Sequence, residues 1–284
     1  MSKRVEKMSA AVCLALLLTG LSLCAAEPVL QASKESYDYA AAMKDVAKKF
    51  KGTPGVVVLL GDSITYANQN TAWALHGEGQ SPEVKAFLKW THVGDGGNVD
   101  GWTAAKTDVE GGRSHTASSG VTTGEYLAGG KHGLPPLSEI IKKYNPQLAL
   151  YMLGTNDMNQ GAAPAAAVAN VEKALDMLMA NGTVPVLSTI PPMKGKIPQV
   201  EAYNAELKKL AEKKKVPLLD LFGEMKALDA DMMCFLTGDG VHLSFDNAAG
   251  APTVENFKKA GYLCRCYFNV QKLMEVKGKV IDAK

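Results

Sequence analysis

The sequence predicts an α/β fold in which a mostly parallel sheet is covered by helices on both faces. Three observations predict it. Short apolar runs alternate with longer segments of helical periodicity along most of the chain. The apolar runs lack polar alternation, as strands buried on both faces require. Turn signals, chiefly Gly, Pro and Asn-Gly, separate the segments. Strands that alternate with helices of this length form parallel sheets through crossover connections.

The elements follow one another in a regular order. An amphipathic helix at 35–51 ends at Gly52, and the run VVVLL at 56–60 is the first strand. The later segments are a helix at 134–145, a strand at 146–154, a helix at 164–182, a strand at 183–190, a helix at 198–215, a strand at 216–222 and a closing helix from about 247 to 277. In such open sheets, ligands bind at the carboxyl ends of the strands, so distant motifs can meet there.

Residues 66–118 interrupt this alternation and are predicted to be a long loop insertion. They are rich in Gly, Asn, Asp and Thr, and only 81–90 looks helical. Long connections without regular structure are usually functional loops or lids. Whether this segment is a lid or a fixed wall stays open.

The same loop carries the candidate substrate-binding residues. They are all three tryptophans and one of the few arginines, namely Trp73, Trp90, Trp102 and Arg113. The rings either pin the loop by local packing or form a sugar-stacking wall. The arginine either binds a substrate carboxylate or pairs locally.

The first 26 residues are predicted to be a secretory signal peptide. A basic leader, an apolar run and small residues follow one another in the order of such peptides. The apolar run is short for a bilayer span of about 20 residues. We therefore expect an exported mature domain, residues 27–284, that is periplasmic or extracellular and has no membrane span. Lipoprotein anchoring through Cys24 is the alternative.

The net charge and the cysteines limit which partners, disulfides and metal sites can be expected. The net charge of +2 shows no electrostatic footprint for nucleic acid. After cleavage three cysteines remain, so at most one disulfide can form. Pairing of Cys234 with Cys264 or Cys266 stays open, as does a pair of buried thiols on the closing helix. No metal-ligand spacing such as CxxC is present.

Four short polar motifs follow predicted strands or precede predicted helices. They are GDSIT at 61–65, SSGVTT at 118–123, GTND at 154–157 and DGVHLS at 239–244. Each alone is compatible with a helix cap or a turn. Together they place Gly-Asp-Ser, Gly, Asn and Asp-x-x-His at one edge of the sheet.

These residue types are suited to nucleophilic catalysis. A serine hydroxyl is a weak nucleophile until a neighbouring base takes its proton, and His242 is the candidate base for Ser63. Asp239 can reach the other ring nitrogen across one turn and fix its tautomer. Ser63 is also expected at a helix N-terminus, where its free backbone N–H favours negative charge. Asp62 and Asp157 are interpreted as loop-bracing residues.

The four motifs in this order resemble the SGNH/GDSL hydrolase family over most of the mature chain. The nucleophile sequence differs from the G-x-S-x-G elbow of the α/β-hydrolases. The resemblance implies a flavodoxin-like three-layer α/β/α sandwich with five strands. It also implies that the Gly120 N–H and the Asn156 side-chain amide join the Ser63 N–H as oxyanion-hole donors.

We therefore expect an exported serine esterase that removes short acyl groups, chiefly acetyl, from a carbohydrate through an acyl-enzyme on Ser63. The expected partner is a small-molecule or glycan ester, and no metal or organic cofactor is implied. Two alternatives are kept: a lysophospholipase or thioesterase of the same fold, and a carbohydrate-binding protein that has lost catalysis. The oligomeric state is not predicted.

Overall fold

The central sheet is parallel and buried. The computed structural model describes residues 34–93, 108–109, 113–114 and 116–283. In these residues the sheet has the order β1 (Val57–Gly61), β4 (Leu148–Met152), β5 (Val184–Ser188) and β6 (Leu218–Leu219). Every residue of the four strands is buried, as their unbroken apolar sequences predict. The predicted α/β class with a parallel sheet is confirmed.

The predicted fifth strand is reduced to a single bridge. Ala117 pairs in parallel with Gly61 at the outer side of β1. The Gly61 N–H donates to the Thr116 carbonyl and the Ser118 N–H to the Gly61 carbonyl, both at 3.3 Å. Polar residues surround Ala117, and the pairing extends no further in the described part of the chain. When Ala117 is counted as the second strand in sequence, the strand order is 2-1-3-4-5, the flavodoxin-like order.

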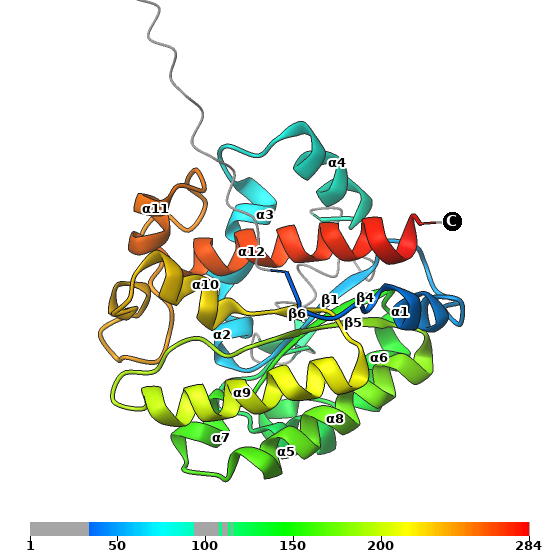
Figure 1. The fold of residues 1–284 in the computed structure, drawn as a ribbon, viewed down its shortest axis with the longest axis horizontal. Coiled ribbons are helices and arrows are strands. Elements are labelled where there is room, and N and C mark those ends of the chain that lie inside the picture. Colours follow the sequence, from blue (N-terminus) through cyan, green and yellow to red (C-terminus); the bar gives the residue numbers. More distant parts are fainter. Residues whose placement is uncertain (1–33, 94–107, 110–112, 115, 284) are drawn as a thin grey trace, which may run out of the picture. The chain divides into compact units, whose positions relative to one another are not determined.

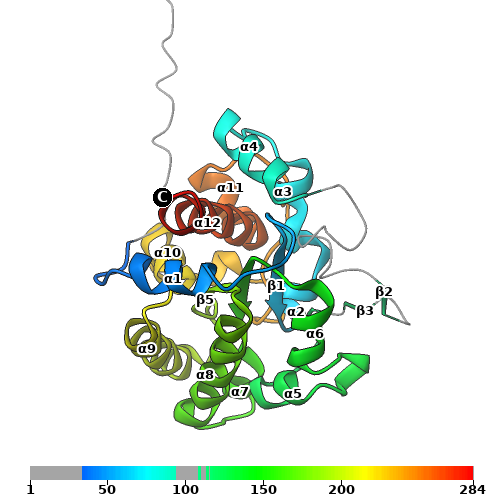
Figure 2. The same ribbon diagram turned by 90° about the vertical axis from the view of Figure 1, so that its right-hand side faces the viewer.

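Helices cover both faces of this sheet. Figures 1 and 2 show α5 to α9 on one face and α12, with α3, α4 and α11, on the other. The helices are α1 (Ala40–Ala47), α2 (Ser63–Tyr66), α3 (Ala72–His76), α4 (Pro82–Trp90), α5 (Thr123–Ala128), α6 (Leu137–Tyr144), α7 (Thr155–Asn159), α8 (Pro164–Asn181), α9 (Ile197–Lys214), α10 (Leu221–Leu228), α11 (Val254–Lys259) and α12 (Gly261–Val276). Short turns of other helix types are η1 (Asn68–Thr71), η3 (Lys131–Gly133), η4 (Met233–Phe235) and η5 (Lys277–Ile281).

Two predicted elements differ from the structure near the C-terminus. The segment 216–222 was predicted as one strand, but only β6 is extended and α10 begins at Leu221. Asp220 ends the strand because its carboxylate caps α10, accepting the Gly223 N–H at 3.2 Å. The predicted single closing helix is divided at Ala260, whose φ of −136° and ψ of 91° are extended. The result is a short α11 followed by α12.

The helix α12 lies inside the molecule rather than on its surface. Every residue from 261 to 270 is buried. The helix packs against α3, η1 and α11. Three of its polar side chains are also buried: Arg265, Asn269 and Lys272. Buried polar groups on a helix need partners in neighbouring elements.

The described part of 66–118 contains more regular structure than predicted. Besides the expected α4, it forms η1 and α3, and Asp108–Val109 (β2) pairs antiparallel with Arg113–Ser114 (β3). Thr71 provides no side-chain cap for α3. Packing of that short helix against α12, rather than local sequence, explains why it forms.

Candidate active site

The turn after β1 presents Ser63. Asp62 is the N-cap of α2, and its Oδ1 accepts the Ile64 N–H at 3.0 Å. Ser63 is therefore the first residue of the helix. Gly61 has no room for a side chain, since a Cβ there would lie 2.0 Å from Thr65 Oγ1. The Gly-Asp-Ser order thus brings a tight approach, a cap and a hydroxyl to the carboxyl end of the first strand.

Ser63, His242 and Asp239 form one hydrogen-bonded chain. His242 Nε2 lies 2.9 Å from Ser63 Oγ, and His242 Nδ1 lies 2.6 Å from Asp239 Oδ2. The structure therefore brings together all three residues predicted as catalytic. An imidazole in this position can take the serine proton while the carboxylate fixes its tautomer and stabilises its charged form.

The carboxylate of Asp239 is held by its own loop. Its Oδ1 accepts the Val241 N–H at 2.9 Å, the His242 N–H at 3.0 Å and the Thr237 hydroxyl at 2.7 Å. Partial burial raises the pKa of Asp239, but these hydrogen bonds and the one from the His242 ring outweigh it. They hold the pKa of this carboxyl well below its ordinary value. Asp239 is therefore ionised at every pH where an imidazole base could work.

The three predicted oxyanion donors lie on neighbouring loops at the same edge. Within the described residues, neither the Ser63 N–H nor the Gly120 N–H has a hydrogen-bond partner. The Asn156 amide donates one N–H to the Val121 carbonyl at 2.9 Å, which ties its loop to that of Gly120. A side-chain amide carries two N–H donors, so one remains for a ligand.

A buried carboxylate braces these loops. Asp157 accepts the Thr123 N–H at 2.9 Å and the Thr123 hydroxyl at 2.6 Å. It therefore joins the start of α7, which carries Asn156, to the start of α5, which follows Gly120. The interpretation of Asp157 as a structural residue agrees with these contacts.

Asp62 is the most deeply buried carboxyl of the site. Its side chain is fully buried, and Oδ2 has no hydrogen-bond partner in the described residues. Burial raises its pKa to about 6, while the Ile64 N–H and the charge of Arg265 act in the opposite direction. This aspartate caps α2, as expected for a bracing residue.

Two side chains that sequence patterns did not single out also hold the site. Lys131 Nζ donates to the Gly120 carbonyl at 2.6 Å and pairs with Glu125. The Tyr203 hydroxyl donates to the Leu153 carbonyl at 2.8 Å. Its ring also fills the space beside Gly154, where a Cβ would lie 2.2 Å from Tyr203 Cε1. Both side chains come from other parts of the chain, so no local motif signals them.

Trp73 is a core residue and not part of an exposed sugar-stacking wall. Its exposure is 1%. The ring packs edge-to-face against Tyr267 with centroids 5.4 Å apart, and Nε1 donates to the Glu78 carbonyl at 2.9 Å. The structural alternative therefore holds for this tryptophan, because its ring has no free face for a sugar.

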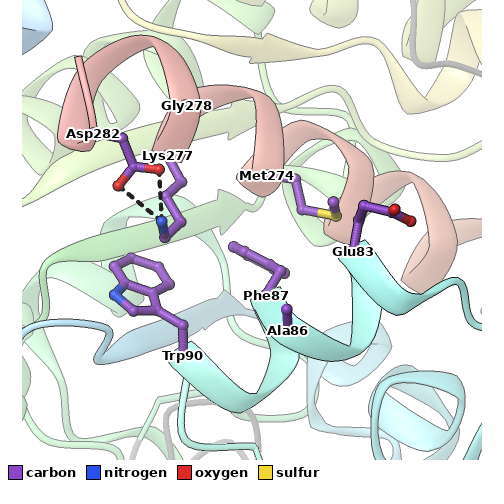
Figure 3. Close-up of a pocket in the computed structure, with 8 residues that line it drawn as sticks. All are labelled: Glu83, Ala86, Phe87, Trp90, Met274, Lys277, Gly278 and Asp282. Carbon is purple, nitrogen blue, oxygen red and sulfur yellow. Dashed lines mark hydrogen bonds and ion pairs between the residues drawn. The ribbon is translucent and has the colours of Figure 1, made fainter.

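Trp90 lines a surface pocket between α4 and the C-terminal segment, shown in Figure 3. The pocket has a volume of about 370 Å³, and Phe87 and Met274 supply much of its apolar lining. Lys277 Nζ lies 4.8 Å from the centre of a Trp90 ring and pairs with Asp282. Residues of the candidate active site do not contribute to this lining.

The two remaining predicted substrate-binding residues are Trp102 and Arg113. Trp102 lies outside the described residues. Arg113 belongs to β3, and only its backbone is described.

Metal-binding clusters and membrane-spanning helices are both absent from the described ranges. There, no group of three or more His, Cys, Asp or Glu side chains is arranged to hold a metal ion. No helix in the same ranges combines the length and apolar character needed to cross a bilayer. No disulfide joins Cys234 to Cys264 or Cys266, and the last two are buried on α12.

Comparison with known proteins identifies a family. The model of the GDSL-like lipase/acylhydrolase family matches residues 59–246, which is more than half of the chain and includes all four motifs. No curated protein matches the chain.

Solved structures agree in fold. A carbohydrate esterase of family 3 from Talaromyces cellulolyticus aligns with a TM-score of 0.51 at 16% identity, covering 80% of this chain and 99% of that chain. A mutant acetyl esterase with an acetate ion gives a TM-score of 0.51 at 16% identity, covering 77% and 97%. A GDSL-like lipase from Bacteroides thetaiotaomicron VPI-5482 gives 0.48 at 16% identity, covering 87% and 100%. At such identities the likeness is one of fold.

Proposed function

We propose that this chain, which belongs to the GDSL-like lipase/acylhydrolase family, is an exported serine esterase that removes short acyl groups, chiefly acetyl, from a carbohydrate. The observation that carries the ester hydrolysis is the hydrogen-bonded chain from Ser63 through His242 to Asp239. It supplies a nucleophile, a base and an orienting carboxylate in one place.

The proposed first step is acyl transfer to Ser63. His242 Nε2 takes the hydroxyl proton as Ser63 Oγ bonds to the ester carbonyl carbon. Negative charge develops on the carbonyl oxygen, and the N–H groups of Ser63, Gly120 and Asn156 are the donors available to stabilise it. When the carbon–oxygen bond to the alcohol breaks, the alcohol leaves with the proton from His242.

The second step hydrolyses the acyl-enzyme and regenerates free Ser63. A water molecule gives a proton to His242 Nε2 while its oxygen attacks the acyl carbon. The bond to Ser63 Oγ breaks, the serine recovers its proton from His242, and a carboxylic acid leaves. Asp239 stays ionised throughout and stabilises the imidazolium in both steps.

The acyl and alcohol parts of the substrate are inferred from the sequence of the first 26 residues and from the family. The leader-like sequence of residues 1–26 favours export of the protein. An exported esterase would have access to extracellular or periplasmic glycans that carry ester groups. A carbohydrate esterase and an acetyl esterase are among the solved structures of similar fold. At 16% identity they support the fold alone, and the buried Trp73 adds no stacking surface for a sugar.

One assay tests this proposal. The mature chain, residues 27–284, is incubated with p-nitrophenyl esters of increasing chain length and, in parallel, with acetylated oligosaccharides whose acetate release is measured. The proposal predicts the highest kcat/KM for acetate and measurable release from the sugars. A preference for long acyl chains or thioesters would favour the lysophospholipase or thioesterase alternative. No turnover of any ester would favour a binding protein.

A further inference from the structure

A buried arginine donates two hydrogen bonds to the one-turn helix that carries Ser63. Arg265 lies on α12, and its exposure is 0%. One terminal nitrogen, Nη1, donates to the Ile64 carbonyl at 2.8 Å, and Nη2 donates to Thr65 Oγ1 at 2.8 Å. Both acceptors belong to the two residues that directly follow Ser63.

The shortness of α2 explains why it needs outside donors. A helix leaves its last four carbonyls without intrahelical partners, and α2 has only the four residues Ser63–Tyr66. The Ser63 carbonyl accepts the Ala67 N–H at 3.1 Å. The Thr65 carbonyl accepts the Asn70 side chain at 3.2 Å. The Ile64 carbonyl accepts a hydrogen bond from Arg265, so a side chain from a distant helix provides the donor that this turn lacks.

Stability alone is a poor reason for a cation at this position. Burial lowers the pKa of Arg265 to about 10, so the guanidinium is still charged at neutral pH. Its Nε has no hydrogen-bond partner in the described part of the chain. Charges removed from water in this way often stabilise a protein less than an apolar residue of the same size would. Burial outweighs the neighbouring Tyr262 and Asp62, whose electrostatic interactions with the guanidinium act in the opposite direction.

We propose that Arg265 is a positioning residue for the nucleophile. By fixing Ile64 and Thr65, it sets the direction of the Ser63 hydroxyl toward His242 and of the Ser63 N–H toward the oxyanion. This inference rests on the proposed function, because it assigns Arg265 to the same reaction. Misplacement of a reacting group by about 1 Å can cost 10²-fold in rate.

The same helix offers a matched control. Lys272 is also a fully buried cation on α12, and its partners include Glu35 at 3.2 Å and Glu275 at 2.9 Å, neither of which belongs to the turn of Ser63. Substitution of either cation with Met removes a buried charge from the same helix. Only Arg265→Met removes contacts to the turn of Ser63.

The test measures how fast diisopropyl fluorophosphate modifies Ser63, together with kcat and KM for p-nitrophenyl acetate and the melting temperature. We expect Arg265→Met to lower the modification rate and kcat by about tenfold or more, with KM within about twofold. Arg265→Lys, which keeps the positive charge but has one donor nitrogen in place of Nη1 and Nη2, is expected to recover part of the loss. Lys272→Met is expected to change both rates by less than about twofold even where it melts earlier.

A second pair of variants covers the case in which Arg265→Met does not fold. Thr65→Val removes one acceptor of the guanidinium without changing side-chain volume, and Thr65→Ser retains it. We expect a slower modification rate for the valine variant only. Equal rates for wild type and Arg265→Met, equal losses for Arg265→Met and Lys272→Met, or equal rates for the two Thr65 variants when Arg265→Met is unfolded would overturn the inference.

The two proposals fail in different ways. If diisopropyl fluorophosphate does not modify Ser63 in the wild type, the serine is not a nucleophile and both proposals fall. If it modifies wild type and Arg265→Met at the same rate, the esterase proposal stands and only the role of Arg265 is removed.

Discussion

The imidazole Nε2 of His242 lies 2.9 Å from the hydroxyl oxygen of Ser63, although 179 positions separate the two residues. The fold produces this contact. The first strand, β1, ends at Gly61, and the loop that carries Asp239 and His242 lies at the same carboxyl edge of the sheet.

Removal of the Asn156 amide is expected to slow the chemical step. Asn156→Ala should lower kcat by about 10²–10³ with little change in KM, because an oxyanion donor acts mainly in the transition state. Asn170→Ala is the matched control, since Asn170 donates to Thr123 Oγ1 at 3.2 Å in the same region but outside the site. An unchanged kcat, or a loss confined to KM, would make Asn156 a purely structural residue.

Neutralisation of Asp239 is expected to remove the orienting partner of His242. Asp239→Asn should lower kcat by roughly 10²–10⁴, because an amide at this place favours the wrong imidazole tautomer. The pKa of Asp239 is held far below its ordinary value, so the wild-type pH–rate profile should show no inflection from this group between about pH 5 and 7. Asp229→Asn, which alters a loop carboxylate paired with Lys258, is the control. Equal kcat in the two variants would remove Asp239 from the triad.

The buried Asp62 should make stability depend on pH. Its pKa is about 6 in the folded protein, against 3.8 for the unperturbed group, so the folded state holds the proton more tightly. The contribution of protonated Asp62 to the free energy of unfolding is therefore fully present below about pH 4 and is lost as the pH rises through 6. That loss is on the order of 3 kcal/mol.

Urea unfolding between pH 4 and 7 measures this dependence. Asp62→Asn can still cap α2 but cannot titrate, so its unfolding free energy should decline less with rising pH than that of the wild type. Parallel curves for the two proteins would show that Asp62 does not carry the dependence.

Trp73 and Trp90 should behave differently when truncated. Trp73→Ala should lower the free energy of unfolding by about 3–5 kcal/mol, because the side chain is buried against Tyr267. Its folded fraction should lose activity equally on an acetylated oligosaccharide and on p-nitrophenyl acetate. Trp90→Ala, at a half-buried position, is the comparison and should cost less stability. A loss confined to the oligosaccharide in Trp73→Ala would restore a sugar-binding role for this residue.

The sequence predicted the strands best. The runs that became β1, β4 and β5 are continuous, apolar and bounded by turn residues, so their burial on both faces is encoded locally. The triad could be predicted because Ser63 follows the first strand, His242 and Asp239 share one motif before the closing helical segment, and open parallel sheets form their sites at the carboxyl ends of the strands. The short β6 was harder to predict, since the cap made by Asp220 ends it after two residues.

Other features depend on contacts that no local pattern contains. The helix α3 has no side-chain cap and forms against α12. The sequence leaves two roles open for Trp73, a packing residue or part of a sugar-stacking wall, because its burial depends on the tertiary fold. The sequence around Arg265 gives no indication of its partner, because the guanidinium donates to the carbonyl of Ile64, which is 201 positions away. Such long-range polar contacts leave no periodic signal in the sequence.

The most direct test of the central claim is the covalent intermediate on Ser63. Wild type and Ser63→Ala are mixed with p-nitrophenyl acetate, quenched within the first turnover and digested for mass spectrometry, with thermal melting as the control for folding. We expect one acetyl group on the peptide that contains Ser63 in the wild type, and neither acetylation nor turnover in the alanine variant. A folded Ser63→Ala protein that hydrolyses the ester at the wild-type rate would show that Ser63 is not the nucleophile.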